Sequence, residues 1–287
     1  MQNLRPLLGI ICCLAIAALF LAAGGDSGLR LGSVSLFLVS GSIGILLHWL
    51  VFIPSFIYQT EKFFDLTGAV SFIATMLIAL VNLPAFDTRT LLLAGMVSLW
   101  ALRLGSLLFL RIQRVGFDRR FADIKPRFWR FGLTWTLGGL WVLVTVAPAL
   151  AAITTLFQVP LGALGYFAVA LWGAGFAIEV VADQQKNRFR RDPANADRFI
   201  RSGLWSRSRH PNYFGEILLW FGIALLALPV LAGWQLLTLL SPLFVILLLT
   251  RVSGIPLLEK KAEQNWGTDP DYIAYRNSTP TLVPRLF

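Results

Sequence analysis

A polar and charged stretch leads directly into a long apolar helix in the last third of the chain. It runs from Gly203 to Glu216 with the sequence Gly-Leu-Trp-Ser-Arg-Ser-Arg-His-Pro-Asn-Tyr-Phe-Gly-Glu. Pro211 suits the first turn of a helix, where a missing N–H costs nothing. Asn212 and Glu216 are four residues apart and therefore share one helical face. Polar groups at the mouth of a membrane helix are costly, so we expect this face to bind a ligand.

A second polar face precedes this stretch, at the end of another apolar run. Glu179, Asp183, Lys186 and Arg190 recur at intervals of three or four residues, which places them on one side of a helix. Acids at the boundary of an apolar run tend to be functional. The alternative is an ordinary membrane exit, with salt-bridged acids and cations whose side chains extend to water.

Arginines mark the ends of other apolar runs. Arg103 lies within one run, Arg111 and Arg114 lie at its end, and Arg251 lies at the end of the last run. Guanidinium groups bind phosphate through paired hydrogen bonds. These residues therefore predict a phosphate-rich ligand.

Gln59 and Glu61 follow an apolar helix that is expected to end near Ile57. The ionised form of a carboxyl group is disfavoured at such a boundary, which would make Glu61 a proton donor near neutral pH. The alternative is a solvated loop acid paired with Lys62.

The composition indicates a polytopic membrane protein. Of the 287 residues, 56% are hydrophobic and 14% are charged, and the mean hydropathy is +0.70, values far from those of soluble domains. We expect an all-α bundle of seven to eight transmembrane helices forming one membrane domain, 1–287. Apolar runs near the length needed to span a bilayer occur at about 6–23, 33–57, 66–83, 90–110, 133–155, 160–182, 213–230 and 234–250.

The basic residues are confined to a few connections. Segments 111–130 and 183–212 hold 15 of the 25 lysines and arginines, and the alternate connections hold almost none. The positive-inside rule then places these loops and both termini in the cytoplasm. The segments 58–65, 111–130, 183–216 and 251–275 are expected to meet on that membrane face. This distribution argues against nucleic acid as a partner.

Several other kinds of site are not supported by the sequence. It lacks the glycine-rich dinucleotide fingerprint, the phosphate-binding loop and the paired-histidine zinc motif. With only His48 and His210, no metal centre is expected. We interpret His48 as a packing residue hydrogen-bonded to a neighbouring helix, and Cys12 and Cys13 as packing residues.

These motifs resemble a known family. Gly203-Leu204-Trp205 and His210 through Glu216, preceded by Ala182-Asp183-Gln184-Gln185-Lys186, are similar to the C-terminal domain of the steroid 5α-reductases. They are more similar to its bacterial branch of uncharacterised membrane proteins, DUF1295, over about 55–287. The resemblance implies a bacterial inner-membrane reductase that uses NADPH, held in a cytoplasm-facing cavity. It would reduce a C=C bond conjugated to a carbonyl in a lipophilic substrate, which could be a steroid or another lipid. The protein would also contact membrane lipids.

The family's functional residues map onto this sequence position by position. Its cofactor contacts match Asp183, Arg190, Asn212, Glu216 and Arg251. The glutamine of its Gln-Glu pair, which contacts the substrate carbonyl, matches Gln59, but Thr60 follows and the acid comes at Glu61. Its tyrosine proton donor has no counterpart, and Trp100 lies near that place. The residues predicted to hold the cofactor are Arg111, Arg114, Glu179, Asp183, Lys186, Arg190, His210, Asn212, Tyr213, Glu216 and Arg251.

Two other functions remain as alternatives. The Arg-His-Pro-x-Tyr-x-Gly pattern and the tail through Trp266 and Tyr272 also resemble the isoprenylcysteine carboxyl methyltransferases, which use S-adenosylmethionine. The Asp183 helix exit and the many arginines favour the reductase. The other alternative is a transporter or a scaffold. Transporters often have matching interrupted helices in two halves of the chain, and none are visible here. No feature specifies an oligomeric state.

Overall fold

The computed structural model describes residues 3–118 and 121–285. The regular secondary structure of this part of the chain is helical apart from one short β-hairpin and an isolated β-bridge. It forms two compact units, which we describe separately. Unit 1 comprises Met1–Leu161 and Leu226–Ser241, and unit 2 comprises Gly162–Leu225 and Pro242–Phe287.

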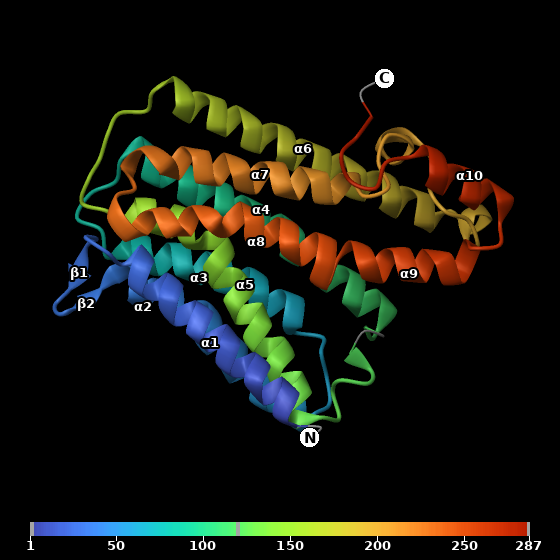
Figure 1. Ribbon diagram of the computed structural model, residues 1–287, viewed down its shortest axis with the longest axis horizontal. Helices are drawn as coiled ribbons and strands as arrows, with labels where there is room; N and C mark the ends of the chain where they lie inside the picture. The colour runs from blue at the N-terminus through green and yellow to red at the C-terminus, as the bar shows by residue number, and fades with distance from the viewer. Residues whose placement is uncertain (1–2, 119–120, 286–287) are drawn as a thin grey trace. The chain divides into compact units, whose positions relative to one another are not determined.

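Unit 1 is built around one buried helix. It contains α1 (Leu4–Gly24), β1 (Arg30–Leu31), β2 (Val34–Ser35), α2 (Leu36–Ile57), α3 (Phe64–Val81), α4 (Thr88–Val115), α5 (Phe128–Thr154) and the short helices η4 (Leu228–Val230) and η5 (Gly233–Leu240). Helix α5 packs against α1, α2, α3 and α4, and 89% of its apolar window is buried. Figure 1 shows α1 lying along α5. The antiparallel hairpin pairs Arg30 with Ser35.

Unit 2 consists of a long helix pair and a helical C-terminal tail. Its elements are α6 (Ala163–Arg191), η2 (Pro193–Asn195), η3 (Gly203–Ser206), α7 (Pro211–Ala227), α8 (Ser241–Leu247), η6 (Leu248–Val252), α9 (Ile255–Trp266) and α10 (Pro270–Ser278). Helix α7 begins at Pro211 as predicted, and α6 continues to Arg191, well beyond its apolar part.

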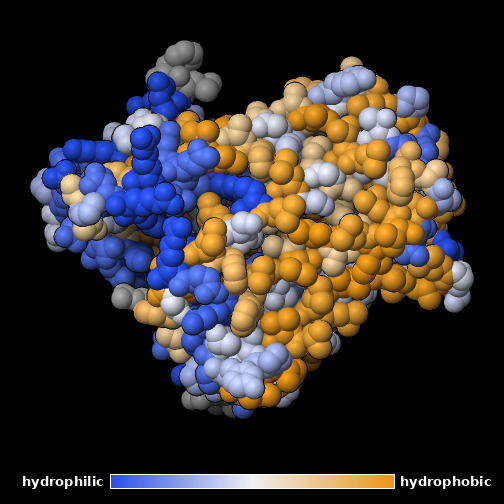
Figure 2. All heavy atoms as spheres, turned by 180° about the vertical axis from the view of Figure 1, so that it is seen from behind, coloured by the Kyte–Doolittle hydropathy of each residue, from blue (hydrophilic) through white to orange (hydrophobic). Residues whose placement is uncertain are grey.

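The helices confirm the expected all-α membrane fold. Among the described residues, eight helices are long and apolar enough to cross a membrane, and they correspond to the eight predicted runs. Many large apolar side chains on them are exposed, and hydrophobic residues cover wide areas of the face in Figure 2. In lipid this exposure is favourable, so the chain is an integral membrane protein.

Glycines let α2 and α5 approach closely in unit 1. A Cβ atom on Gly139 would lie 2.7 Å from the Cα of Ile45, and one on Gly44 would lie 3.0 Å from the side chain of Val142. The hydrophobic effect does not favour helix association in lipid. Such helix pairs are instead held together by close packing through small residues and by hydrogen bonds between the helices. Trp49 donates such a bond to the hydroxyl of Thr136 across 3.1 Å.

Helices α6 and α7 of unit 2 approach even more closely, and Figure 1 shows them side by side. A Cβ on Gly215 would lie 2.5 Å from the carbonyl oxygen of Gly175 and 2.7 Å from the backbone nitrogen of Glu179. Gly222 lies in the same way against the backbone of Trp172. Only glycine fits at these positions without moving the helices apart.

The α6–α7 contact leads to a stability prediction. Gly215→Ala forces a methyl group into the backbone of α6 and should destabilise the protein by about 1–3 kcal/mol, the usual cost of overpacking. Gly173→Ala is the matched control, because it lies on α6 and a Cβ there meets no atom within 4 Å. It should be neutral or slightly stabilising, since alanine favours helix. Thermal unfolding in detergent measures both, and equal melting temperatures would contradict this packing.

Candidate functional site

The α6–α7 contact brings predicted site residues together in unit 2. The side-chain amide of Asn212 donates a hydrogen bond to a carboxylate oxygen of Asp183 across 3.2 Å. Glu179 and Glu216 are both buried, with exposed fractions of 2% and 8%. Gly215, beside the backbone of Glu179, makes this proximity possible. The two polar faces predicted from separate sequence segments thus belong to one packed helix pair.

The Gly203-Leu204-Trp205 motif packs on the end of α6. Gln185 accepts a hydrogen bond from the backbone N–H of Leu204 at 2.9 Å, and the indole of Trp205 donates to the carbonyl of Ala182 at 3.0 Å. Gly203 has a φ of 62°, a conformation that glycine adopts without strain. The ammonium of Lys186 lies 4.4 Å from the centre of the Trp205 ring, within cation–π range. Predicted site residue Lys186 is therefore held by an aromatic ring.

Glu259 joins the start of α7 to the C-terminal tail. It accepts hydrogen bonds from the guanidinium of Arg209 and from Nε2 of His210, the latter at 2.7 Å. Arg209 also donates to the hydroxyl of Thr281 across 2.6 Å. The ring of His210 stacks on Tyr213, with centroids 5.7 Å apart. Glu259 was not predicted as a site residue, because its partners lie 49 and 50 residues away in the sequence.

Burial controls the protonation of this cluster. Burial lowers the pKa of His210, and the hydrogen bond from its ring to Glu259 opposes that shift. Nε2 then donates to the carboxylate, and Nδ1 is an acceptor. Among the described residues, His210 Nδ1 and Arg209 Nε are buried and have no hydrogen-bond partner. Buried polar atoms without partners are rare, but both atoms are covered by protein here, so a ligand would contact them only after the surrounding groups move.

The remaining predicted cations lie on the surface of their units. Arg190 and Arg251 in unit 2 are exposed, as are Arg111 and Arg114 in unit 1. Arg111 lies 3.7 Å from the carboxylate of Asp65. Exposed guanidiniums fit the phosphates of a dinucleotide.

Glu61 is placed differently from its expected setting. Only 4% of it is exposed, and its carboxylate accepts hydrogen bonds from the backbone N–H of Asp118 at 2.6 Å and from the ammonium of Lys125. Its partner is Lys125 and not Lys62. Glu61 therefore acts as an acceptor in this structure, whereas the sequence analysis expected a proton donor.

Gln59 is exposed on the connection that precedes Glu61. Its φ is 50°, and its side-chain amide donates to the carbonyl of Phe56 at 2.7 Å. The predicted polar segments thus meet in pairs. In unit 1, 58–65 contacts 111–130 through Glu61 and Lys125. In unit 2, 183–216 contacts 251–275 through His210 and Glu259. A common site for all four segments stays a prediction.

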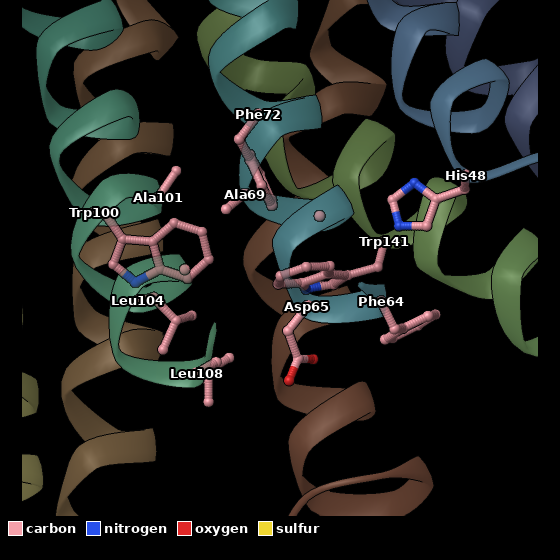
Figure 3. Close-up of a pocket in the computed structure, with 12 residues that line it drawn as sticks. His48, Phe64, Asp65, Ala69, Phe72, Trp100, Ala101, Leu104, Leu108 and Trp141 are labelled. Carbon is pink, nitrogen blue, oxygen red and sulfur yellow. The ribbon is translucent and has the colours of Figure 1, made fainter. Parts of the chain in front are cut away.

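A narrow pocket lies among α2, α3, α4 and α5 of unit 1. Figure 3 shows Phe72, Trp100 and Trp141 around it, and His48 and Asp65 add polar groups to the indole N–H groups of the two tryptophans. Trp100 lies near the sequence position of the family tyrosine, whereas Asp65 and Trp141 were not predicted as site residues. His48 packs edge-on to Phe64 at 5.9 Å, in agreement with a packing role. Its Nδ1 bonds to the carbonyl of Gly44 at 2.6 Å, which is on its own helix and not on the expected neighbour.

Comparison with known proteins gives the family. The model of the family described as "Protein of unknown function (DUF1295)" matches residues 51–279. A Delta(14)-sterol reductase of Aspergillus fumigatus is 39% identical over 18% of this chain, and the match spans only 13% of that relative's length. The family match includes Glu61, Asp183 and Glu259, whereas the pocket residue His48 lies outside it. The chain therefore belongs to the DUF1295 family, which is associated with steroid 5α-reductase-like proteins.

Proposed function

We propose that this protein is a membrane-embedded, NADPH-dependent reductase of a C=C bond conjugated to a carbonyl in a lipophilic substrate. The observation that carries the proposal is the polar α6–α7 pair, in which Asp183 and Asn212 are joined beside the His210–Tyr213 stack. Membership of DUF1295 and the short similarity to a sterol reductase support a reductase. The use of NADPH and the conjugated carbonyl of the substrate are the parts of the function that we propose beyond this support.

Residues of unit 2 have the chemistry that a phosphorylated dinucleotide requires. The exposed guanidiniums of Arg190 and Arg251 would neutralise its phosphates through charge-assisted hydrogen bonds. The Asn212 amide, oriented by Asp183, would bind its polar groups. When bound, the reduced nicotinamide supplies the hydride.

The His210–Glu259 contact would position one further donor or acceptor for the cofactor. Because Glu259 holds Nε2, the ring is fixed with Nδ1 as a buried acceptor that has no partner among the described residues. Nδ1 suits a hydroxyl or an amide N–H of the dinucleotide. The ring of Tyr213, stacked on the ring of His210, limits its rotation. A ring fixed in this way binds without first losing conformational freedom.

We assign the polarising role on the substrate carbonyl to the Glu61–Lys125 pair and to Gln59. The ammonium of Lys125 is the donor of the pair, and Glu61 orients it. A donor directed at a carbonyl oxygen stabilises the negative charge that develops there when hydride adds to the β-carbon. An apolar surrounding strengthens this stabilisation.

The cofactor proposal is tested with charge-matched variants. Arg190→Ala and Asn212→Ala should each weaken NADPH binding about tenfold, the effect of losing one hydrogen bond to a charged group. Arg188→Ala also removes one positive charge, but Arg188 lies two residues from Arg190 and on another side of α6. The NADPH affinity of this control variant should therefore be nearly unchanged. Fluorescence titration of the purified protein with NADPH measures the dissociation constants. Equal losses in both arginine variants would show a general effect of charge and contradict the assigned site.

Ligand binding by the same purified protein distinguishes a reductase from a methyltransferase. Wild-type protein should bind NADPH and show no saturable binding of S-adenosylmethionine. Saturable binding of S-adenosylmethionine without NADPH binding would contradict the reductase and favour the methyltransferase.

The carbonyl-polarising pair leads to a separate prediction. Lys125→Met should lower the turnover of a steroid enone such as progesterone at least about tenfold, because one oriented donor is lost. Glu61→Gln keeps the size of the side chain but loses the charge that orients Lys125, so its turnover should fall by a smaller factor. NADPH affinity should stay within about twofold in both. Full turnover in Lys125→Met would place the donor elsewhere.

A further inference from the structure

A second pocket of unit 1 lies where α4 begins and the chain leaves α5. Its cavity volume is about 270 Å³, and it is lined by Asp87, Thr88, Arg89 and residues 158–161. A cavity of this size has room for several water molecules or for a polar group of similar size. Arg89 is in the first turn of α4, whereas Arg111 is near its other end. The pocket is therefore at the opposite end of α4 from the basic segment 111–130, and the predicted topology places it on the outer side of the membrane.

Arg89 carries a buried positive charge into this pocket. It is only 3% exposed, and its guanidinium donates hydrogen bonds to the backbone carbonyls of Leu226 and Val159, the latter at 3.4 Å. Within residues 3–118 and 121–285, no carboxylate forms an ion pair with it. Carbonyl groups supply only partial negative charges, and buried charges in proteins are normally paired with a full counter-charge. Arg89 therefore suits an anionic ligand group.

Asp87 brings the opposite charge to the same pocket. One carboxylate oxygen caps α4 by accepting the backbone N–H of Thr90 at 2.7 Å. The other oxygen has no hydrogen-bond partner in the described part of the chain, where no lysine or arginine forms an ion pair with Asp87. An inorganic phosphate would satisfy Arg89 but would be repelled by Asp87. A ligand that satisfies both residues must carry an anion and a cationic donor a few atoms apart.

The surface beside the pocket is apolar. Phe86 and Phe157 directly precede the lining residues Asp87 and Gln158, and both rings are exposed, as is Leu91 in the first turns of α4. Exposed apolar side chains at the end of a membrane helix contact the acyl chains of lipids. They favour a ligand whose charged group is attached to acyl chains over a water-soluble compound.

We propose that this pocket binds the headgroup of phosphatidylethanolamine, with the lipid phosphate beside Arg89 and the primary ammonium on the carboxylate of Asp87. The positive end of the α4 dipole adds to the attraction for the phosphate. The inference goes beyond the proposed reduction and does not depend on it. Phosphatidylcholine has the same two charges, but its trimethylammonium has no N–H to donate, and phosphatidylglycerol has no cation.

The test is native mass spectrometry of the protein after delipidation in detergent. The probe is an equimolar mixture of phosphatidylethanolamine, phosphatidylcholine and phosphatidylglycerol with identical acyl chains. The first lipid adduct should contain phosphatidylethanolamine at least about tenfold more often than either other lipid, the effect of one hydrogen bond to a charged group. Equal occupancy by the three lipids would overturn the proposal.

A charge-matched pair of variants tests Asp87. Asp87→Asn removes the charge but keeps the helix cap, since asparagine caps helices as well as aspartate does, so the lipid preference should fall to within about twofold. Asp26→Asn is the control. Asp26 accepts the backbone N–H of Trp234 at 3.1 Å and does not line the pocket, so this variant should keep the preference. A preference that persists in Asp87→Asn, or that is lost equally in both variants, would refute the role of Asp87.

The role of Arg89 is tested without altering its contacts to the backbone. A phosphotriester analogue of phosphatidylethanolamine, in which a methyl group neutralises the phosphate, keeps the ammonium and the acyl chains. It should bind the wild-type protein at least about tenfold more weakly than the natural lipid. Equal binding of the two would refute the pairing of the phosphate with Arg89.

A second pair of variants and a soluble competitor test the location and the source of the ligand. Thr88→Trp extends a large ring over the pocket and should remove the preferred adduct. Leu99→Trp adds the same ring at a lipid-exposed position of α4 outside the pocket and should retain it. A tenfold excess of glycerophosphoethanolamine, the headgroup without acyl chains, should not displace the lipid. Adducts retained in Thr88→Trp, or displacement by the soluble headgroup, would overturn the proposal.

Discussion

The close approach of α6 and α7 is the constraint on which the proposed cofactor site depends. Gly175 and Gly215 let the two backbones meet, and this contact brings Asp183 within hydrogen-bond distance of Asn212. In a bilayer the favourable free energy of helix association comes from close packing of the backbones, because lipid solvates apolar side chains as well as another helix does. The polar groups at the start of α7 are thus fixed by the contact of Gly215 with the backbone of α6.

The tail completes the polar cluster of unit 2 from outside this helix pair. Glu259 and Thr281 hold Arg209, and Glu259 also fixes one nitrogen of His210. Tyr275 donates a hydrogen bond to the carbonyl of Trp205 at 2.7 Å, and burial raises the pKa of its hydroxyl, which keeps it a donor. The tail therefore acts as a support for the loop between α6 and α7. Such supporting contacts keep binding groups in place before a ligand arrives.

Local sequence patterns predicted the helices but not the partners of their side chains. Pro211 marked the start of α7, and the spacing of Glu179, Asp183 and Lys186 predicted the helical exit of α6, since both depend on residues within a few positions. Glu61 and Lys125 are 64 residues apart, and no periodicity within either segment connects them. The pocket was missed for the same reason, because Asp65 and Trp141 come from different helices. Tertiary packing alone brings such groups together.

Transfer of hydride from a reduced nicotinamide to a lipophilic enone is the central claim. It is tested most directly by incubating the purified protein with NADPH deuterated at the transferable position of the nicotinamide and with progesterone. Mass spectrometry of the product should show one added deuterium on the β-carbon and one hydrogen from solvent. A reduced product without deuterium would contradict it. So would the absence of any reduction, under saturating NADPH, of progesterone, other steroid enones and long-chain lipid enones.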